Sequence, residues 1–154
     1  MKRLTFLLFF VFVFGCKEER KPVPPYKVEI QIILPNEVKI FQKEYSVQKS
    51  VYEVLLDLQK ENQLQFETKG RGETLFLESI AGVSNQGLGD DKNNWIYFVD
   101  QKLAQVGMAQ MVLEDDSVVV WCFTTWKEKE KCIQSPTKIE GDPHDKVMVP
   151  NPAK

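Results

Sequence analysis

Two stretches near the start of the chain alternate between apolar and polar side chains. Residues Val28–Ile32 read Val-Glu-Ile-Gln-Ile, and a period of two is typical of a strand with one buried face. The alternation returns between Val38 and Val47, after a turn marked by Pro35 and Asn36. The pattern therefore predicts a β-hairpin.

The period changes to that of a helix after Ser50. Ser50 and Glu53 have the spacing of a capping box, in which each side chain accepts a hydrogen bond from a backbone N–H at the helix start. The apolar residues that follow recur at helical spacing and predict one buried stripe: Val51, Val54, Leu55 and Leu58. The helix is expected to end in the region 60–62.

The rest of the chain, up to Thr125, has the composition of strands. Short β-prone runs cover residues 65–67, 75–77, 95–99, 104–106 and 117–125. The charged run Lys127–Lys131 then predicts a solvated hairpin or loop, whose charges discourage pairing with another chain. One helix among several strands predicts an α+β fold, with one main helix packed on a mixed β-sheet.

The first sixteen residues have the organisation of a bacterial lipoprotein signal. Two basic residues precede the apolar run Leu4–Phe14, and small Gly15 stands directly before Cys16. The segment Val13–Cys16 resembles a lipobox, which implies that Cys16 becomes the acylated (palmitate-bearing) first residue of a protein held outside the cytoplasm. An ordinary secretory signal also fits the leader but does not require this cysteine. A transmembrane helix needs about 20 apolar residues, more than this run offers.

Charge and cysteine content narrow the class further. Without the two basic residues of the leader, 18 basic and 22 acidic residues remain, a net charge of −4 that does not suit a nucleic-acid-binding protein. With Cys16 lipidated, Cys122 and Cys132 are left, and a disulfide between them is expected in an oxidising compartment. The alternative is two unlinked thiols. A metal site is disfavoured because two cysteines do not complete a ligand set.

The chain divides into four parts. Residues 1–15 form the signal peptide, 16–26 the lipidated cysteine and a flexible, proline-rich tether, 27–133 one folded domain, and 134–154 a disordered tail with several prolines. The expected location is the cell envelope, at the outer membrane or the cell surface.

The folded part is similar to the transcobalamin-like C-terminal domain family, which has a β-grasp type of fold. The matching segments are Ser50–Leu55, Ile80–Val83, Trp95–Val99, and Gly107, Leu113, Asp115-Asp116 and Val118–Trp121. Two departures replace a glycine of the family pattern, at Asp100-Gln101 and at Glu114-Asp115-Asp116, so the turns there are expected to differ. The resemblance implies a small-molecule or partner-binding module, with a corrinoid such as cobalamin as its named ligand. The helical domain of the vertebrate carriers has no counterpart in this chain.

The candidate binding surface is the loop Val83–Asn94 together with aromatic side chains next to it. Trp95 and Tyr97 share one face of their strand, and both faces of that strand are bulky, whereas a single helix covers one face. We therefore predict ligand contacts at Asn94, Trp95, Tyr97 and Trp126. The alternative is a conventional core in which tails or a second layer cover the aromatic face.

Catalytic chemistry is hard to find in the sequence. The single histidine, His144, lies in the tail, so no Ser-His-Asp or Cys-His set can form. The pairs Asp90-Asp91 and Asp115-Asp116 lie in turns and would need further oxygens to bind calcium. The sequence predicts a non-catalytic binding module without cofactor or metal, or alternatively an envelope protein–protein interaction domain without a small-molecule ligand.

Overall fold

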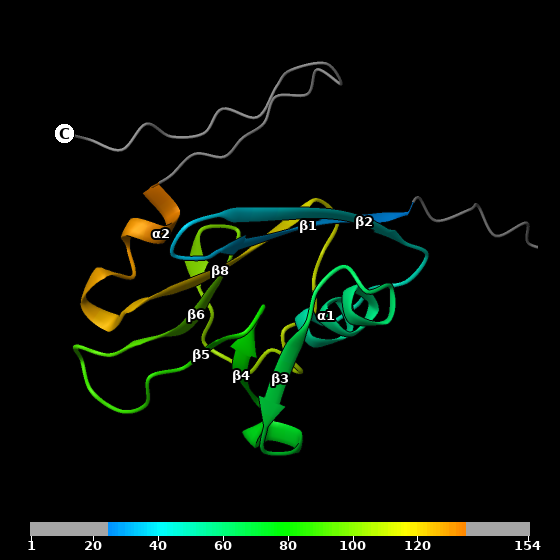
Figure 1. Ribbon diagram of the computed structural model, residues 1–154. Coiled ribbons are helices and arrows are strands. Elements are labelled where there is room, and N and C mark those ends of the chain that lie inside the picture. Colours follow the sequence, from blue (N-terminus) through cyan, green and yellow to red (C-terminus); the bar gives the residue numbers. More distant parts are fainter. Residues whose placement is uncertain (1–24, 135–154) are drawn as a thin grey trace, which may run out of the picture.

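Two β-sheets and one main helix form the described part of the chain, residues 25–134 of the computed structural model (Figure 1). The predictions on the signal peptide, on Cys16 and the tether, and on His144 and the tail lie outside these residues. The α+β class predicted from the sequence is confirmed. The larger sheet is mixed, as predicted, but the strands that directly follow the helix form a second, smaller sheet that the sequence did not predict.

The larger sheet has five strands in the order β2-β1-β8-β6-β7. Its strands are β1 (Tyr26–Ile33), β2 (Val38–Tyr45), β6 (Asn93–Val99), β7 (Lys102–Leu103) and β8 (Ser117–Thr125). The first strand pairs antiparallel with β2 and parallel with the last, β8. Because β1 and β8 run in the same direction, the start of β1 and the end of β8 lie at opposite ends of the sheet.

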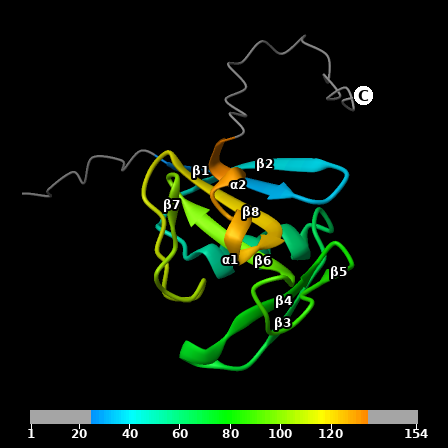
Figure 2. The ribbon, with the colours of Figure 1, turned by 90° about the vertical axis from the view of Figure 1, so that its left-hand side faces the viewer.

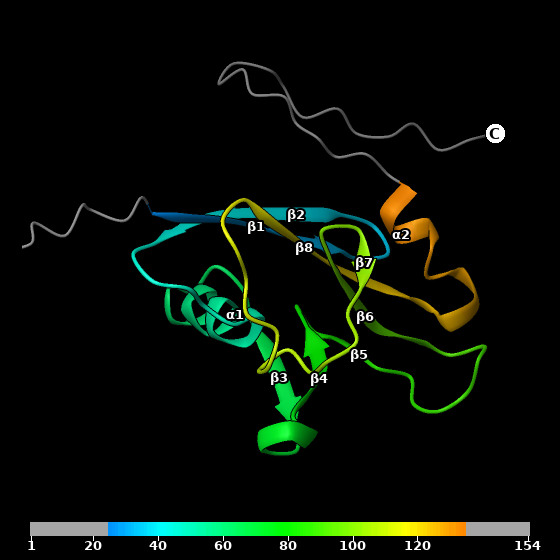
Figure 3. The same ribbon diagram turned by 180° about the vertical axis from the view of Figure 1, so that it is seen from behind.

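The smaller sheet consists of β3 (Phe66–Lys69), β4 (Phe76–Ile80) and β5 (Val83–Ser84), all antiparallel. Four helical segments complete the fold: α1 (Val51–Lys60), the single-turn η1 (Gly72–Thr74) and η2 (Trp126–Glu128), and α2 (Lys131–Gln134). Figures 1 and 3 show α1 and the smaller sheet on the same side of the larger sheet. We call the side of the larger sheet that faces α1 its inner face.

The main core lies between the inner face and α1. Alternation along the strands sends every second side chain inward, so Ile30 and Ile32 of β1 and Val119 of β8 are fully buried there. The apolar stripe of α1 meets them, and its predicted members are all fully buried: Val51, Val54, Leu55 and Leu58. Strand β8 is buried on both faces along its middle, where apolar side chains follow one another without alternation.

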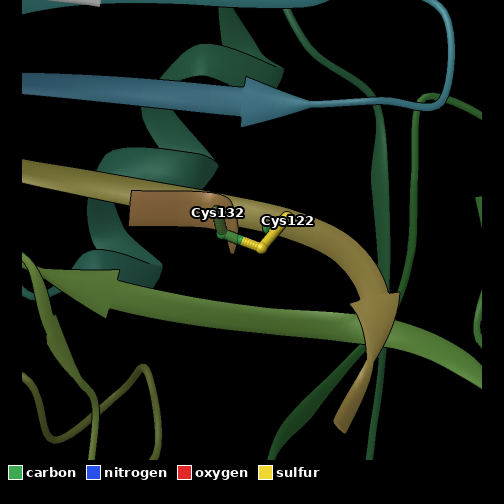
Figure 4. Close-up of a disulfide and its surroundings, with 2 residues drawn as sticks. All are labelled: Cys122 and Cys132. Atoms are coloured by element: carbon green, nitrogen blue, oxygen red, sulfur yellow. A yellow bond between two sulfur atoms is a disulfide. The ribbon is translucent and has the colours of Figure 1, made fainter. Parts of the chain in front are cut away.

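A second, smaller core covers part of the opposite, outer face of the larger sheet. Phe98 of β6 and Val120 of β8 are buried there beneath Cys132 of α2. Figures 2 and 4 show α2 in front of β8, with α1 behind the sheet. The charged run Lys127–Lys131, predicted as a hairpin or loop, instead contributes to η2 and starts α2.

The start of α1 is closed by hydrogen bonds from two directions. Ser50 and Glu53 form the predicted capping box: the Ser50 hydroxyl accepts from the Glu53 N–H, and the Glu53 carboxylate accepts from the Ser50 N–H at 2.7 Å. The N–H groups of Val51 and Tyr52 donate to backbone carbonyls of residues 111 and 108. The segment that contains residues 108 and 111 is therefore tied to the start of the helix. The predicted strand through residues 104–106 is wrong, since β7 ends at Leu103.

The capping box generates a prediction about stability. We expect Ser50→Ala to lower the free energy of unfolding by about 1 kcal/mol, because the Glu53 N–H loses its acceptor. The hydrogen bond from the Ser50 backbone N–H lowers the pKa of Glu53 below 4.5. A lowered folded-state pKa stabilises the fold above pH 4.5, and this contribution is lost as the pH falls through the folded-state value. Glu53→Gln should therefore flatten the loss of stability on acidification.

Urea denaturation at neutral and acid pH measures both effects. Glu73→Gln is the control, because Glu73 is exposed in η1, away from α1. A pH profile of Glu53→Gln equal to that of the wild type would contradict the role assigned to this carboxylate.

Candidate functional site

The part of the outer face that α2 leaves uncovered contains a polar groove of about 520 Å³. It crosses β2, β1 and the start of β8, and its side walls come from cross-strand neighbours: Lys27 pairs with Glu44, and Glu29 pairs with Gln42 on one side and Val118 on the other. We call this hollow the outer groove. Its lining residues are Lys27, Val28, Glu29, Gln42, Lys43, Glu44, Asp116 and Val118.

Glu29 is the most firmly placed polar group of the outer groove. Its two carboxylate oxygens accept hydrogen bonds from the side-chain amides of Gln31, at 2.7 Å, and Gln42, at 3.1 Å. Because both oxygens are held, the carboxylate keeps one orientation without a ligand. A preorganised acceptor of this kind loses little conformational entropy when a ligand binds.

More carboxylates gather where β8 begins. Asp115 accepts from the backbone N–H of Lys27 at 2.9 Å, and Asp100 accepts from the backbone N–H of Val118 at 2.8 Å. Asp116 lines this end of the outer groove together with Lys27, so side chains of both charges are present there. The arrangement can bind a ligand with hydrogen-bond donors and charged groups of either sign on a partly apolar floor at Val118.

Trp95, predicted to contact a ligand, lies on the inner face. Its side chain is 8% exposed, and its ring lies 5.3 Å from that of Phe123 within the main core. Its indole N–H donates to the carbonyl of Val83 at 2.8 Å. The ring therefore joins the larger sheet to the smaller one, and the face predicted to be free for a ligand is a core face.

Tyr97 lies on the same inner face. Its ring stacks on that of Trp121 with centroids 4.6 Å apart, and its hydroxyl donates to the carbonyl of Val106 at 2.5 Å. Burial raises the pKa of Tyr97 to about 12. The hydroxyl thus holds the segment after β7 against the core, and only the partly exposed edge of Tyr97 remains open to a ligand.

Asn94 and Trp126, the other two predicted contacts, lie at the end of the sheet where β8 finishes. The Asn94 side chain accepts from the Gly87 N–H at 3.2 Å and donates to the Gly87 carbonyl at 2.9 Å, which braces the loop before β6. Trp126 is 52% exposed, with the Lys129 ammonium 4.3 Å from its ring centroid. At the tip of the braced loop Leu88 is fully exposed. The binding role of Asn94 and Trp126 stays a prediction.

Asn85 is the residue that sequence reasoning missed. Its side-chain amide donates to the Leu77 carbonyl of β4 at 2.6 Å and accepts from the Trp95 N–H of β6 at 2.7 Å, and its own N–H donates to the Glu78 carbonyl. One side chain therefore connects the two sheets. Nothing in the local sequence distinguishes it from the other polar residues of the loop.

The predicted disulfide is confirmed. Cys122 of β8 and Cys132 of α2 are bonded, with Cα atoms 6.0 Å apart (Figure 4). In the chain-entropy account, a crosslink over so short a loop stabilises the fold by about 2–3 kcal/mol. Among residues 25–134 no group of three or more histidine, cysteine or acidic side chains is placed to hold a metal ion. Likewise, no helix within the described range is long and apolar enough to span a membrane.

Residues 49–125 match a family described as a domain of unknown function (DUF4430). The chain belongs to this family. The match begins just before α1 and ends with β8. A search of the curated proteins finds no significant match.

The DUF4430 protein also resembles two solved structures in fold. One is a protein from Ruminococcus gnavus ATCC 29149 to which metal binding has been provisionally attributed, with 14% identity and a TM-score of 0.50 over 65% of this chain and 97% of that chain. The other is haptocorrin in complex with Cbi, with 16% identity and a TM-score of 0.52 over 65% of this chain. This chain matches only 25% of haptocorrin. The similarity supports the transcobalamin-like fold expected from the sequence.

The bridging role of Asn85 can be tested by mutation. We expect Asn85→Ala to lower the free energy of unfolding by about 2–3 kcal/mol, because the Leu77 carbonyl and the Trp95 N–H both lose their partner. Gln86→Ala is the control, since the Gln86 side chain accepts one exposed hydrogen bond, from the Asn93 N–H. Chemical denaturation of both variants measures the difference. Equal stability of the two variants would contradict the bridging role.

Proposed function

We propose that this protein is an envelope lipoprotein whose domain, a β-grasp-like member of the DUF4430 family, binds a ligand without transforming it. The observation that carries the proposal is the outer groove, where polar side chains line a volume of about 520 Å³ and Glu29 is held ready by two amides. Small-molecule sites commonly measure about 300–1,000 Å³ and place a few oriented polar groups on a partly apolar surface.

The anchor is proposed from the leader and from where the domain begins. Cys16 precedes the first residue of β1, Tyr26, by ten positions. A chain of that length reaches at most about 35 Å. Lys27 lines the outer groove, so an acylated Cys16 would keep the groove end of the domain near the bilayer, with Trp126 at the far end.

The disulfide supports a location outside the cytoplasm. Disulfides persist in oxidising compartments and are rare in the cytosol, where thiols are kept reduced. The Cys122–Cys132 bond agrees with a signal sequence that directs export. The leader with Cys16 and the disulfide lie at opposite ends of the chain and point to the same compartment.

A corrinoid is the ligand that the likeness to haptocorrin suggests. The match covers 25% of haptocorrin, so three quarters of that protein has no counterpart here. A corrinoid would therefore rest against one side of this domain and remain accessible on the other, in agreement with a groove rather than an enclosed cavity. A non-catalytic role is supported by the absence of histidine from residues 25–134 and by the engagement of both their cysteines in the disulfide.

A second function, docking of another envelope protein, is favoured by a separate surface. Leu88, at a loop tip, is fully exposed, and Trp126 is 52% exposed at the same end of the sheet. Two hydrogen bonds from the Asn94 side chain brace the backbone of Gly87, directly before Leu88. Exposed tryptophans such as Trp126 are common anchors in protein interfaces.

The anchor predicts a clear effect of one substitution. We expect Cys16→Ser to abolish incorporation of radiolabelled palmitate and to move the protein from the membrane to the soluble envelope fraction, because no thiol remains to be acylated. Cys132→Ser is the control, since it removes a cysteine from the folded domain but leaves the leader and Cys16 intact. Wild-type protein found unprocessed in the cytosol, with residue 16 unmodified, would contradict the proposal.

The ligand proposal is tested by gel filtration with cobalamin. The soluble form that begins after Cys16 should elute together with the red chromophore, and Glu29→Ala should weaken binding about tenfold through the loss of a charged hydrogen-bond acceptor. Trp126→Ala, at the opposite end of the sheet, should bind like the wild type. If no form elutes together with cobalamin, a corrinoid is excluded as the ligand. Loss of binding in Trp126→Ala alone would move the site to the far end.

A further inference from the structure

The C-terminal described segment, residues 126–134, crosses the outer face beside the outer groove, and we call it the strap. It contains η2 and α2 and belongs to neither sheet. Cys132, 6% exposed, and half-buried Ile133 are the strap side chains that belong to the apolar cluster on this face. The apolar side chains of the sheet in this cluster, which we call the outer patch, are Ile33, Ile96, Phe98, Leu103, Val118 and Val120.

Polar contacts do not fasten the strap to the sheet. Within residues 126–133, every hydrogen bond and ion pair formed among the described residues stays inside the strap, as between Lys131 and Glu128 or between the Lys129 ammonium and the Trp126 carbonyl. A helix of four residues such as α2 is not stable by itself. The disulfide from Cys132 to Cys122 is therefore the main attachment.

The outer patch continues directly from the outer groove. Val118 belongs to both, because it lines the groove and packs in the cluster beneath the strap. Two residues further along β8, Val120 lies on the same outer face and is only 8% exposed. Phe98, its neighbour on β6, is fully buried. The groove thus ends where the strap begins to cover the sheet.

We infer that the strap is a redox-controlled gate on the outer groove: the Cys122–Cys132 disulfide holds it closed, and reduction releases it and extends the groove over the outer patch. The inference rests on the proposed binding function of that groove. Release removes no strand from either sheet, since the strap contributes none. The open form adds an apolar floor to a polar groove and so accepts a longer, more apolar ligand.

The reductant is a dithiol, such as the active-site pair of an extracytoplasmic thiol–disulfide oxidoreductase. Its thiolate attacks one sulfur of the Cys122–Cys132 bond, and the other sulfur leaves as a thiolate and takes up a proton. The second thiol of the reductant then displaces the remaining cysteine from the mixed disulfide. Two electrons pass to the cysteine pair, and the dithiol becomes a disulfide.

The gate can be tested on the full-length protein without a ligand. We compare three samples: oxidised wild type, wild type reduced with dithiothreitol, and the double variant Cys122→Ala/Cys132→Ala. Each is treated with trypsin, which cuts at the strap residues Lys127, Lys129 and Lys131. A second portion of each is labelled with hydroxyl radicals. We expect strap cleavage and radical labelling of Phe98 to rise about tenfold or more in the reduced and variant forms, as for a locally opened segment. Phe66 of the main core, 7% exposed, is the internal control and should stay unlabelled.

Three results would overturn the gate. Protection of the strap and Phe98 in the cysteine-free variant would show that packing alone holds the strap. Labelling of Phe66 together with Phe98 would show that the disulfide supports the whole fold. If the disulfide of the wild type is reduced only after the whole protein unfolds, a dithiol cannot open the strap in the folded state. None of these readouts depends on cobalamin, so failure of the gate is distinguishable from failure of the proposed ligand.

Discussion

A single amide side chain makes two of the hydrogen bonds that join the two sheets of this domain. Asn85 lies just after the smaller sheet and reaches both a carbonyl of β4 and the first buried N–H of β6. The indole of Trp95 adds a second bond between the sheets, to the Val83 carbonyl. Because these bonds lock the smaller sheet against the inner face, α1 and the core between the layers keep one arrangement, and the outer face remains the side on which other molecules can be met.

The two faces of the larger sheet therefore differ in what covers them. The inner face is filled by α1 and the aromatic pair Tyr97–Trp121, and it stabilises the fold. The outer face changes along its length from a polar groove near the start of β1 to an apolar patch under the strap. Such a division explains how a small domain can offer a binding surface without weakening its core.

Local patterns in the sequence were sufficient for part of this structure. The period of two in Val28–Ile32 and the capping box at Ser50 depend on neighbouring residues alone, and both predictions are confirmed. The face of β6 could not be assigned, because Trp95 and Ile96 are both bulky and only tertiary packing decides which one points inward. The outer groove was missed for the same reason, since its walls at Glu29, Gln42 and Val118 meet only through strand register.

One detail of α1 bears on ligand choice. Helix N-termini attract phosphate groups through their unpaired backbone N–H groups. In this protein the N–H groups of Val51 and Tyr52 are occupied by backbone carbonyls, and that of Glu53 by the Ser50 hydroxyl. The start of α1 therefore has no free N–H group at these three positions for a phosphate, and a phosphate-bearing compound would have to be held by other groups of the protein.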